Sequence, residues 1–555
     1  MTFLPGRLNA AVARAYRLAA FAACAVLAAG CGGGAGSVPT APGRAQSAST
    51  AQVTFTMHWA SSSTSAALRT PKYVGAAQSI SVTVNGGSPQ FLNAPLTTLV
   101  IDAPVGTDTF VFTTYDQLNG GGNVISTASV TKQIVLGAAN TVSAVLNGVV
   151  ASFTVTLQNA SPNAGVPASE QISINAFDAD GNVIAGSASN YEQPFTLSVS
   201  DPSNSGQVTL STTVVKSRSV VSTMHYAGGT LWSASIVVSA PGLGSHSVTF
   251  APKPTFYQFS IPVSTNRPQF IAAGSDGNMW FTESPNDVAR ITPAGVVTEF
   301  TVPTASSNPQ QIIGASDGNL WFTEFGANKI AKVTTTGTFT EFATLFAPPP
   351  SDNPFGLVDR LDGNVWYVAN GSSRVGFQSV SGGTAGETSV PTANSAPWGI
   401  ATAPDNNLYY TESAVDKIGR ITNLFTAQSE ISLTTGSTPE AIVRGPDGNL
   451  WFTENGTSKI GRLSPNSFSV TGEFPTSTPN AAPIGIAVGQ DGALWFTENG
   501  LDRIGRITTG GTVSEYASPV TGLALKGIAV APDGSLWFCE PGSGANPGRI
   551  GKLVY

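Results

Sequence analysis

The stretch Asp276-Gly-Asn-Met-Trp-Phe-Thr-Glu283 decides the fold, because it is the first of seven closely similar copies in the chain. Successive copies begin between 41 and 45 residues apart, at the aspartates numbered 276, 317, 362, 405, 447, 491 and 533. A repeat of that length with several short strands is typical of the blades of a β-propeller. One blade cannot bury both of its faces, whereas seven in a ring can. The sequence therefore predicts a seven-bladed propeller.

The repeat at residues 302–342 shows how one blade would be built. Its Asp-Gly-Asn segment predicts a tight turn, because these residues tolerate a positive φ. From the inner strand outward, we expect strands at residues 309–315, 320–324, 329–334 and 339–342. The chain stops at Tyr555, after the third strand of the last repeat, and residues 256–262 supply an outer strand ahead of the first. We therefore predict that this N-terminal strand closes the ring.

Two side chains of the repeat recur in nearly every copy, and we assign both to the scaffold. The aromatic position predicts packing between blades, at Trp280, Trp321, Trp366, Tyr409, Trp451, Trp495 and Trp537. The final glutamate recurs at 283, 324, 412, 454, 498 and 540, and Ala369 replaces it in the third copy. We expect each glutamate to accept hydrogen bonds from a loop of the neighbouring blade; a cation-binding ring is the alternative.

The N-terminal half of the chain has no such repeat. Residues 51–148 and 149–252 each contain about six short runs in which apolar and polar residues alternate, separated by turn residues. This pattern predicts two β-sandwiches. They resemble the immunoglobulin-like modules that bacterial surface proteins carry as spacers. The segment Asp178-Ala-Asp-Gly-Asn182 looks like the start of a calcium loop, but position twelve is Ser189, so we favour an ordinary turn.

The first fifty residues predict export. Three arginines precede a short apolar run and small residues, so residues 1–30 are typical of a secretory signal. The small residues before Cys31 resemble a bacterial lipobox, which predicts a lipid on Cys31; an ordinary cleaved signal peptide is the alternative. Residues 31–50 predict a flexible tether. We therefore expect a monomeric protein of the cell envelope, lipid-anchored to a membrane and either periplasmic or on the cell surface.

Composition narrows the possible partners and chemistry. The formal net charge is −7, and no basic patch of a nucleic-acid binder is present. Of three cysteines, Cys24 lies in the signal and Cys31 should carry lipid, so Cys539 has no partner for a disulfide. Because Cys539 replaces the repeat's threonine, we expect a buried filler. The three histidines, His58, His225 and His246, all precede the propeller.

The repeats resemble the streptogramin B lyase (virginiamycin B lyase) family. The resemblance rests on segments such as DGNLWFTE, NKIAKVT and TEF, and it covers residues 256–555. It implies a propeller, and an enzyme that opens the lactone ring of the antibiotic by elimination with Mg2+ and a histidine base. It also implies a Glu-Pro-His-Gly-Ile segment in the seventh blade, a Pro-His in the sixth and a metal-binding glutamate after the seventh-blade Trp-Phe.

This chain departs from the family at each of those places. Ala524 stands where the resemblance places the metal glutamate, and Lys526 where it places the histidine base. The sixth-blade position is Ile484, and Pro541 occupies the later glutamate position, with Glu540 one place early. Lys526 could act as a base only if burial lowered its pKa. We therefore expect no catalytic residue and no cofactor, with Mg2+ needed only if lyase activity is retained.

The residue after each inner-strand proline, or its equivalent, should face one end of the central channel. We call these seven residues the mouth set: Gln269, Gln310, Phe355, Trp398, Glu440, Ile484 and Lys526. They vary while the scaffold stays constant, which favours recognition of a glycan, peptide or protein. Trp398 lies outside the repeated packing position, so we expect its ring to be free for binding. The alternative is that the mouth set only plugs the channel.

The sequence thus predicts an all-β chain of two sandwiches and a propeller at residues 253–555. For function it favours an envelope-anchored binding or scaffolding protein. A lyase of the streptogramin type, cleaving a carbon–oxygen bond, and a purely structural envelope protein are the alternatives.

Overall fold

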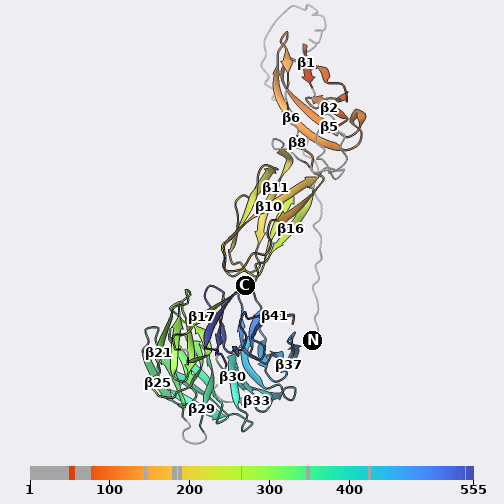
Figure 1. Cartoon of the computed structure of the whole chain (residues 1–555). Helices are drawn as coiled ribbons and strands as arrows, with labels where there is room; N and C mark the ends of the chain where they lie inside the picture. The colour runs from red at the N-terminus through yellow and green to blue at the C-terminus, as the bar shows by residue number, and fades with distance from the viewer. Residues whose placement is uncertain are drawn as a thin grey trace, which may run out of the picture.

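The computed structural model describes residues 49–56, 77–142, 144, 147–177, 184, 190–263, 265–345, 351–422, 427–543 and 546–555. The predicted signal, Cys31, the tether, His58 and the segment resembling a calcium loop lie outside these ranges. Two β-modules precede a large ring of sheets (Figure 1). Apart from one short 3₁₀ turn, Leu118–Gly120, the described elements are all strands, which confirms the all-β prediction. No helix within the described ranges is long and apolar enough to cross a bilayer.

The first module packs two sheets around a core that contains Val53, Phe110 and Ile134. One sheet has the order β4-β1-β7 and the other includes β3-β2-β5-β6. Alternating burial along β5 explains the arrangement, since every second side chain enters the core. The strands are β1 (Thr50–Thr56), β2 (Ser79–Val84), β3 (Gln90–Asn93), β4 (Thr98–Pro104), β5 (Gly106–Tyr115), β6 (Val124–Ile134) and β7 (Asn140–Thr141).

The second module has the same plan, with Phe153, Phe195 and Met224 in its core. Its first sheet is β12-β14-β10-β9, and β16, β15, β11 and β13 form the other. β12 and β13 follow each other closely in the sequence but belong to opposite sheets. The strands are β9 (Ser152–Leu157), β10 (Ala168–Phe177), β11 (Asn190–Ser200), β12 (Val208–Leu210), β13 (Val214–Ser217), β14 (Ser222–Tyr226), β15 (Ala234–Ala240) and β16 (Gly244–Phe250).

A two-residue strand, β8 (Asn147–Gly148), joins the two modules. It pairs antiparallel with β6 of the first module and parallel with β11 of the second. One nine-stranded sheet therefore runs through both modules.

The C-terminal part consists of seven antiparallel four-stranded sheets, or blades. Each begins at an inner strand and ends at an outer one, and the outer strands follow one another around the periphery in Figure 1. The first three blades are β18 (Arg267–Ala273), β19 (Met279–Ser284), β20 (Asp287–Ile291), β21 (Val297–Thr301); β22 (Pro309–Gly314), β23 (Leu320–Glu324), β24 (Lys329–Val333), β25 (Phe339–Ala343); and β26 (Pro354–Asp359), β27 (Asn364–Ala369), β28 (Arg374–Ser379), β29 (Ala385–Ser389).

The remaining four blades complete the ring, and the last takes its outer strand from the start of the propeller. They are β30 (Pro397–Thr402), β31 (Leu408–Glu412), β32 (Lys417–Thr422), β33 (Ala427–Ser432); β34 (Pro439–Arg444), β35 (Leu450–Glu454), β36 (Lys459–Ser464), β37 (Ser469–Pro475); β38 (Pro483–Val488), β39 (Leu494–Glu498), β40 (Arg503–Ile507), β41 (Val513–Ala517); and β42 (Ile528–Val530), β43 (Leu536–Glu540), β44 (Arg549–Val554), β17 (Thr255–Ser260).

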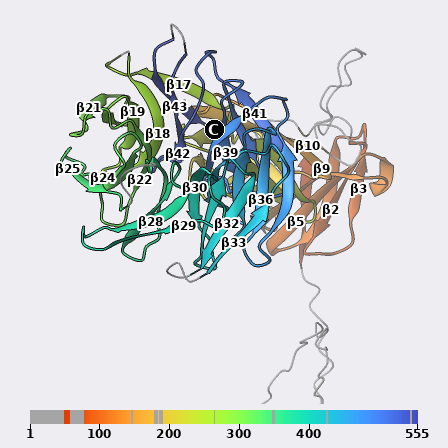
Figure 2. The same ribbon diagram turned by 90° about the horizontal axis from the view of Figure 1, so that it is seen from below.

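Two contacts close the ring. β17 pairs antiparallel with β44, from Thr255 opposite Val554 to Ser260 opposite Arg549. The last blade therefore takes its outer strand from the N-terminal end of the propeller, as predicted. The inner strands β42 and β18 also contact each other, so the first and last blades are neighbours (Figure 2).

The repeated aromatic residues hold the blades together. Trp321, for example, is fully buried and packs with Leu357 and Val365 of the next blade. Its indole N–H donates to the Asp317 carboxylate of its own turn, at 3.2 Å. The same burial is found at Trp280, Trp366, Tyr409, Trp451, Trp495 and Trp537.

The second module is docked onto the sixth and seventh blades. Its Trp232 lies edge-on to Trp495, with ring centroids 6.2 Å apart. The Arg506 guanidinium lies 3.9 Å from the Trp232 ring centroid and is held by Asp491, at 2.7 Å. The Leu231 N–H donates to the Tyr555 carbonyl, at 2.5 Å, which places the chain's C-terminus at the junction (Figure 1). Trp232 therefore lies in a docking loop just before β15.

Candidate binding site

The mouth set lies at one end of the central channel, at or next to the start of each inner strand. Threonines of the second strands fix these positions, because their hydroxyls donate to the carbonyl of the mouth residue in the following blade. The Thr411 hydroxyl donates to the Glu440 carbonyl at 2.6 Å, and Thr497 to Lys526 at 2.5 Å. The same bond joins Thr282 to Gln310, Thr323 to Phe355 and Thr453 to Ile484. A scaffold residue thus sets the geometry of a variable one.

An aromatic cluster occupies part of this mouth. The Phe355 and Trp398 ring centroids are 4.5 Å apart, and Phe270 lies 5.7 Å from the first and 5.5 Å from the second. Our expectation of a free Trp398 ring is therefore wrong, because two phenylalanines pack against it. Phe270 was missed by the sequence analysis. Its signal was available, because the equivalent residue of four blades is glycine: Gly356, Gly399, Gly485 and Gly527.

Charged and polar members of the mouth set also come together. The Lys526 ammonium donates to the Gln269 side-chain oxygen at 2.5 Å, across the junction between the seventh and first blades. Burial lowers the pKa of Lys526, although the neighbouring Cys539 and Glu440 oppose this shift. Burial raises the pKa of Glu440 to about 7, and Lys526 acts against that increase. The mouth therefore holds two incompletely solvated ionisable groups of opposite type.

Gln310 and Ile484 belong neither to the aromatic cluster nor to the Lys526–Gln269 hydrogen bond. The Gln310 amide nitrogen donates to Asn308 of its own blade, 3.2 Å from the side-chain oxygen. For Ile484, the structure shows the backbone bond from Thr453 given above. The aromatic and charged side chains of the mouth set are therefore those of Phe355, Trp398, Glu440 and Lys526.

The repeated glutamates are fully buried, but their partners differ from our expectation. Where hydrogen-bond partners are found, they belong to the same blade: Asn266 donates to Glu283, at 3.3 Å, and Gln258 to Glu540, at 3.1 Å. Burial, together with the nearby Glu341 carboxylate, raises the pKa of Glu324 to about 8. A carboxyl with this pKa is mostly protonated at neutral pH, and Glu412, Glu454 and Glu540, whose pKa is raised to about 7, are about half protonated. A protonated, enclosed carboxyl is a scaffold group and a poor cation ligand.

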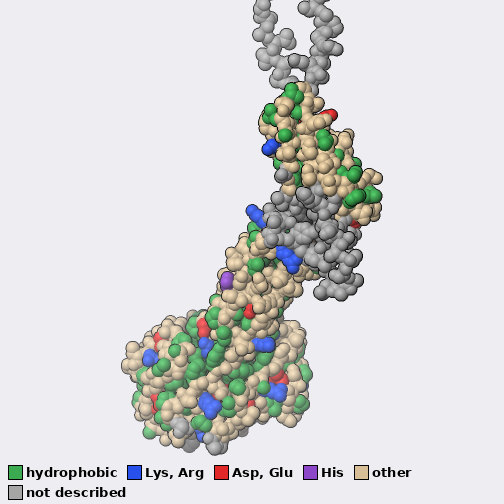
Figure 3. All heavy atoms as spheres, turned by 45° about the horizontal axis from the view of Figure 1, so that its top comes forward, with side chains coloured by type: hydrophobic (Ala, Val, Ile, Leu, Met, Phe, Trp, Pro, Cys, Tyr) green, Lys and Arg blue, Asp and Glu red, His purple; other side chains and the backbone are tan. Residues whose placement is uncertain are grey.

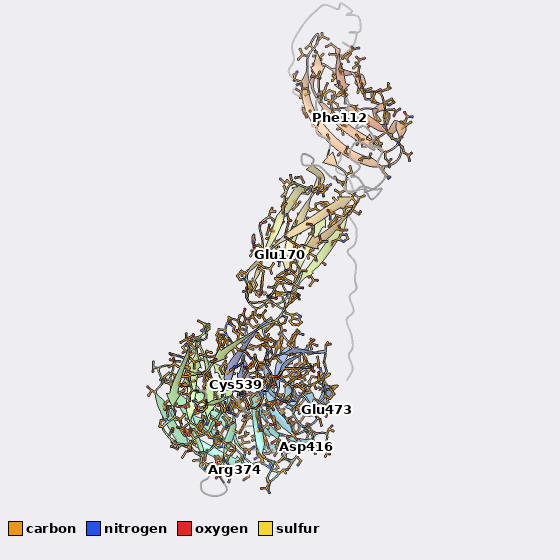
Figure 4. The ribbon with its side chains drawn as sticks, in the orientation of Figure 1. Phe112, Glu170, Arg374, Asp416, Glu473 and Cys539 are labelled. Atoms are coloured by element: carbon orange, nitrogen blue, oxygen red, sulfur yellow. The ribbon has the colours of Figure 1, made fainter. Side chains whose placement is uncertain are left out.

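The positions at which the family resemblance places catalytic groups carry other roles here. The backbone N–H of Ala524 donates to the Asp502 carboxylate at 2.9 Å, and Ala524 has a positive φ of 54°. The cationic Lys526 faces Gln269, and Ile484 offers no donor atom. Cys539 is fully buried inside the propeller, away from the peripheral Arg374, Asp416 and Glu473 (Figure 4). The described residues contain no cluster of three histidine, cysteine or acidic side chains suited to a metal.

The closed ring of four-stranded sheets, joined by threonine hydrogen bonds between blades, defines a β-propeller with a variable mouth. The chain belongs to the virginiamycin B lyase family, whose model matches residues 249–385 and 348–554. The comparison with curated proteins gave no match.

Solved structures agree with this assignment over the propeller. A streptogramin B lyase structure is 36% identical, covering 54% of this chain and 97% of its own, with a TM-score of 0.50. The selenomethionine-substituted virginiamycin B lyase from Staphylococcus aureus is 32% identical, covering 55% of this chain and 100% of its own, with a TM-score of 0.50. A catalytically inactive histidine-to-alanine variant of the S. aureus enzyme, solved with quinupristin, gives the same values.

Proposed function

We propose that this protein is an exported binding protein in which a lyase-type propeller serves recognition rather than elimination. One observation carries the proposal: the mouth holds Lys526, Ala524 and Ile484 at the places where the family resemblance puts two histidines and a metal glutamate. No histidine occurs after His246 in the sequence. A general base must be able to lose its proton near the operating pH, which histidine does without any perturbation.

The residues present do not fit Mg2+. This ion prefers oxygen ligands, above all carboxylates. Ala524 and Ile484 have apolar side chains, and the Lys526 ammonium would repel the ion. Burial raises the pKa of the neighbouring Glu440 to about 7, so its carboxyl is only about half ionised at neutral pH. The mouth therefore does not suit chemistry that depends on Mg2+.

The lyase alternative has one supporting observation, the lowered pKa of Lys526. The decisive experiment incubates the protein with quinupristin and Mg2+ and follows the linear product by mass spectrometry. We expect no turnover. Turnover that disappears in Lys526→Met would establish a lysine-based lyase and refute the binding proposal. Lys216→Met, which changes an exposed lysine of the second module, is the matched control.

The proposed ligand is a glycan, peptide or protein segment that meets the mouth set. Aromatic groups beside a lysine and a carboxyl suit a partner with both a flat apolar face and hydrogen-bonding groups. A glycan and peptide array with the wild type and the Glu440→Gln and Lys526→Met variants tests this. We expect saturable binding of one class, weakened at least tenfold in both variants. A purely structural envelope protein would show no saturable ligand.

We also propose that the chain is anchored through a lipid on Cys31, which would hold the modules and propeller at an envelope membrane. The support is the sequence alone, through the signal-like segment and the small residues before Cys31. Detergent phase partition of the wild type against Cys31→Ala tests the anchor. We expect the wild type in the detergent phase and the variant in the aqueous phase; both in the aqueous phase would contradict it.

A further inference from the structure

A second hollow lies inside the propeller, beyond the mouth. It is a cavity of about 360 Å³ whose wall is formed by five neighbouring inner strands, from β22 to β38. Trp398 lies at one end of this wall, and Thr402 and Arg444 lie at the other, where β30 and β34 finish. A volume of this size suits a small organic molecule.

The two ends of the cavity differ. At the mouth end, Trp398 is packed against Phe270 and Phe355, so aromatic rings narrow the channel there. At the opposite end, where the Asp-Gly-Asn turns lie, Arg444 is exposed to solvent. A ligand would therefore enter from the turn end and come to rest beneath Trp398.

Ten of the fourteen residues that line the cavity are apolar, although polar atoms make up about half of the exposed lining, and the two charged residues lie at its open end. Val358, Ile400, Ile442 and Val443 line it, and each is at least partly buried. Such a surface favours an apolar molecule, since burying apolar area is worth roughly 25 cal/mol per Å².

Two charged residues, Asp359 and Arg444, lie at the rim of the cavity, and only the side chain of Asp359 forms hydrogen bonds with other described residues of the propeller. Both carboxylate oxygens of Asp359 accept backbone N–H groups, from Ser316 at 2.6 Å and Leu361 at 2.8 Å. In contrast, the guanidinium of Arg444 makes no hydrogen bond or ion pair with any described residue. A free guanidinium at the open end of an apolar cavity suits a planar carboxylate, which it can bind through two hydrogen bonds.

We propose that the channel is a second binding site, which shares only Trp398 with the mouth set and is reached from the turn end, for an apolar small molecule with a single carboxylate. The apolar body lies beneath Trp398 among the inner strands, and the carboxylate binds Arg444 at the turn end. This site does not depend on the function proposed for the mouth, because the two are reached from opposite ends of the propeller.

Isothermal titration calorimetry with two matched probes tests the proposal on the full chain. 1-Naphthoate has a flat apolar body with a carboxylate, and 1-naphthalenemethanol has the same body without the charge. We expect the wild type to bind naphthoate at least tenfold more tightly than the alcohol. In Arg444→Gln this preference should vanish, because the guanidinium is gone while the apolar wall remains. Lys216→Gln, remote from the propeller, should keep the preference.

A cavity-filling variant shows whether the probes bind inside the channel. Val443 lines the cavity and is half-buried, so Val443→Phe can extend into the empty space. We expect it to lose both probes while retaining the wild-type circular dichroism spectrum. Val296→Phe makes the same change at a residue that is 63% exposed and should bind normally. Equal affinity for the two probes, undiminished binding by Val443→Phe, or no binding of naphthoate by the wild type would each refute the site.

Discussion

Glu324 keeps a proton at neutral pH, because burial raises its pKa to about 8 from 4.5. Between these values the folded chain holds a proton that the unfolded chain has released. The free energy of unfolding should therefore fall as the pH rises from about 5 to about 8. Glu324→Gln has no carboxyl proton to release at this position on unfolding. The free energy of unfolding should therefore fall less steeply with pH in this variant, by about 1.4 kcal/mol per pH unit. Chemical denaturation at several pH values measures it.

A blade can form without this carboxyl, because the third blade has the fully buried Ala369 at the position of the repeated glutamate. Asp102→Asn, at an exposed position of the first module, is the control and should leave the slope unchanged. If Glu324→Gln kept the wild-type slope, the carboxyl would have to be ionised in the folded chain.

Neighbouring inner strands are joined by the threonine hydroxyls as well as by packing. The Thr411 hydroxyl accepts the Gly399 N–H of its own blade at 2.8 Å and donates to the Glu440 carbonyl of the next. Thr411→Val would leave both groups without their partner at a buried position. We expect a loss of about 1–3 kcal/mol in the free energy of unfolding, measured by guanidinium denaturation.

Val368 and Cys539 already replace this threonine in the third and seventh blades, so single losses are compatible with folding. Thr340→Val, on the exposed side of an outer strand, is the matched control. A Thr411→Val variant as stable as the wild type would show that water can replace the hydroxyl.

The strands were more predictable from the sequence than the contacts of the site. The alternation of apolar and polar residues and the repeated Asp-Gly-Asn turn predicted the strand Leu320–Glu324 and its equivalents. Both signals lie within a few neighbouring residues. The closing strand followed from counting strands in the last repeat. In contrast, the packing of Trp398 depends on Phe270, three blades away along the ring and 128 residues earlier in the chain. No local pattern encodes such a contact. The docking of Trp232 on Arg506 was missed for the same reason.

Across the whole molecule, the second module and the propeller behave as one unit because Trp232 is enclosed by Trp495, Tyr516 and Arg506. Trp232→Ala removes these ring contacts but leaves the backbone bond from Leu231 to Tyr555. We expect about 2 kcal/mol or more of docking free energy to be lost. Small-angle scattering should then show a broader distribution of sizes, and calorimetry a separate transition for the module.

A control for Trp232→Ala comes from an exposed side chain of the same module. Figure 3 shows the module and the propeller together, with Lys and Arg side chains spread singly over this face of the propeller. Val221→Ala, at a side chain of the second module that is 47% exposed, provides the control. Unchanged scattering in Trp232→Ala would mean that the backbone contacts alone fix the orientation.

The pairing of β17 with β44 also has a consequence for biosynthesis. β17 is the first propeller strand to be made, and its partner follows at the very end of the chain; Gln258 and Arg549, which meet in the pair, are 291 residues apart. At 5–20 residues per second, β17 waits roughly 15–60 s on the ribosome without its neighbour. The ring can be closed only after β44 has been synthesised. Nascent chains truncated before Arg549 should therefore remain protease-sensitive, and a chaperone that masks an unpaired edge would find its substrate in that interval.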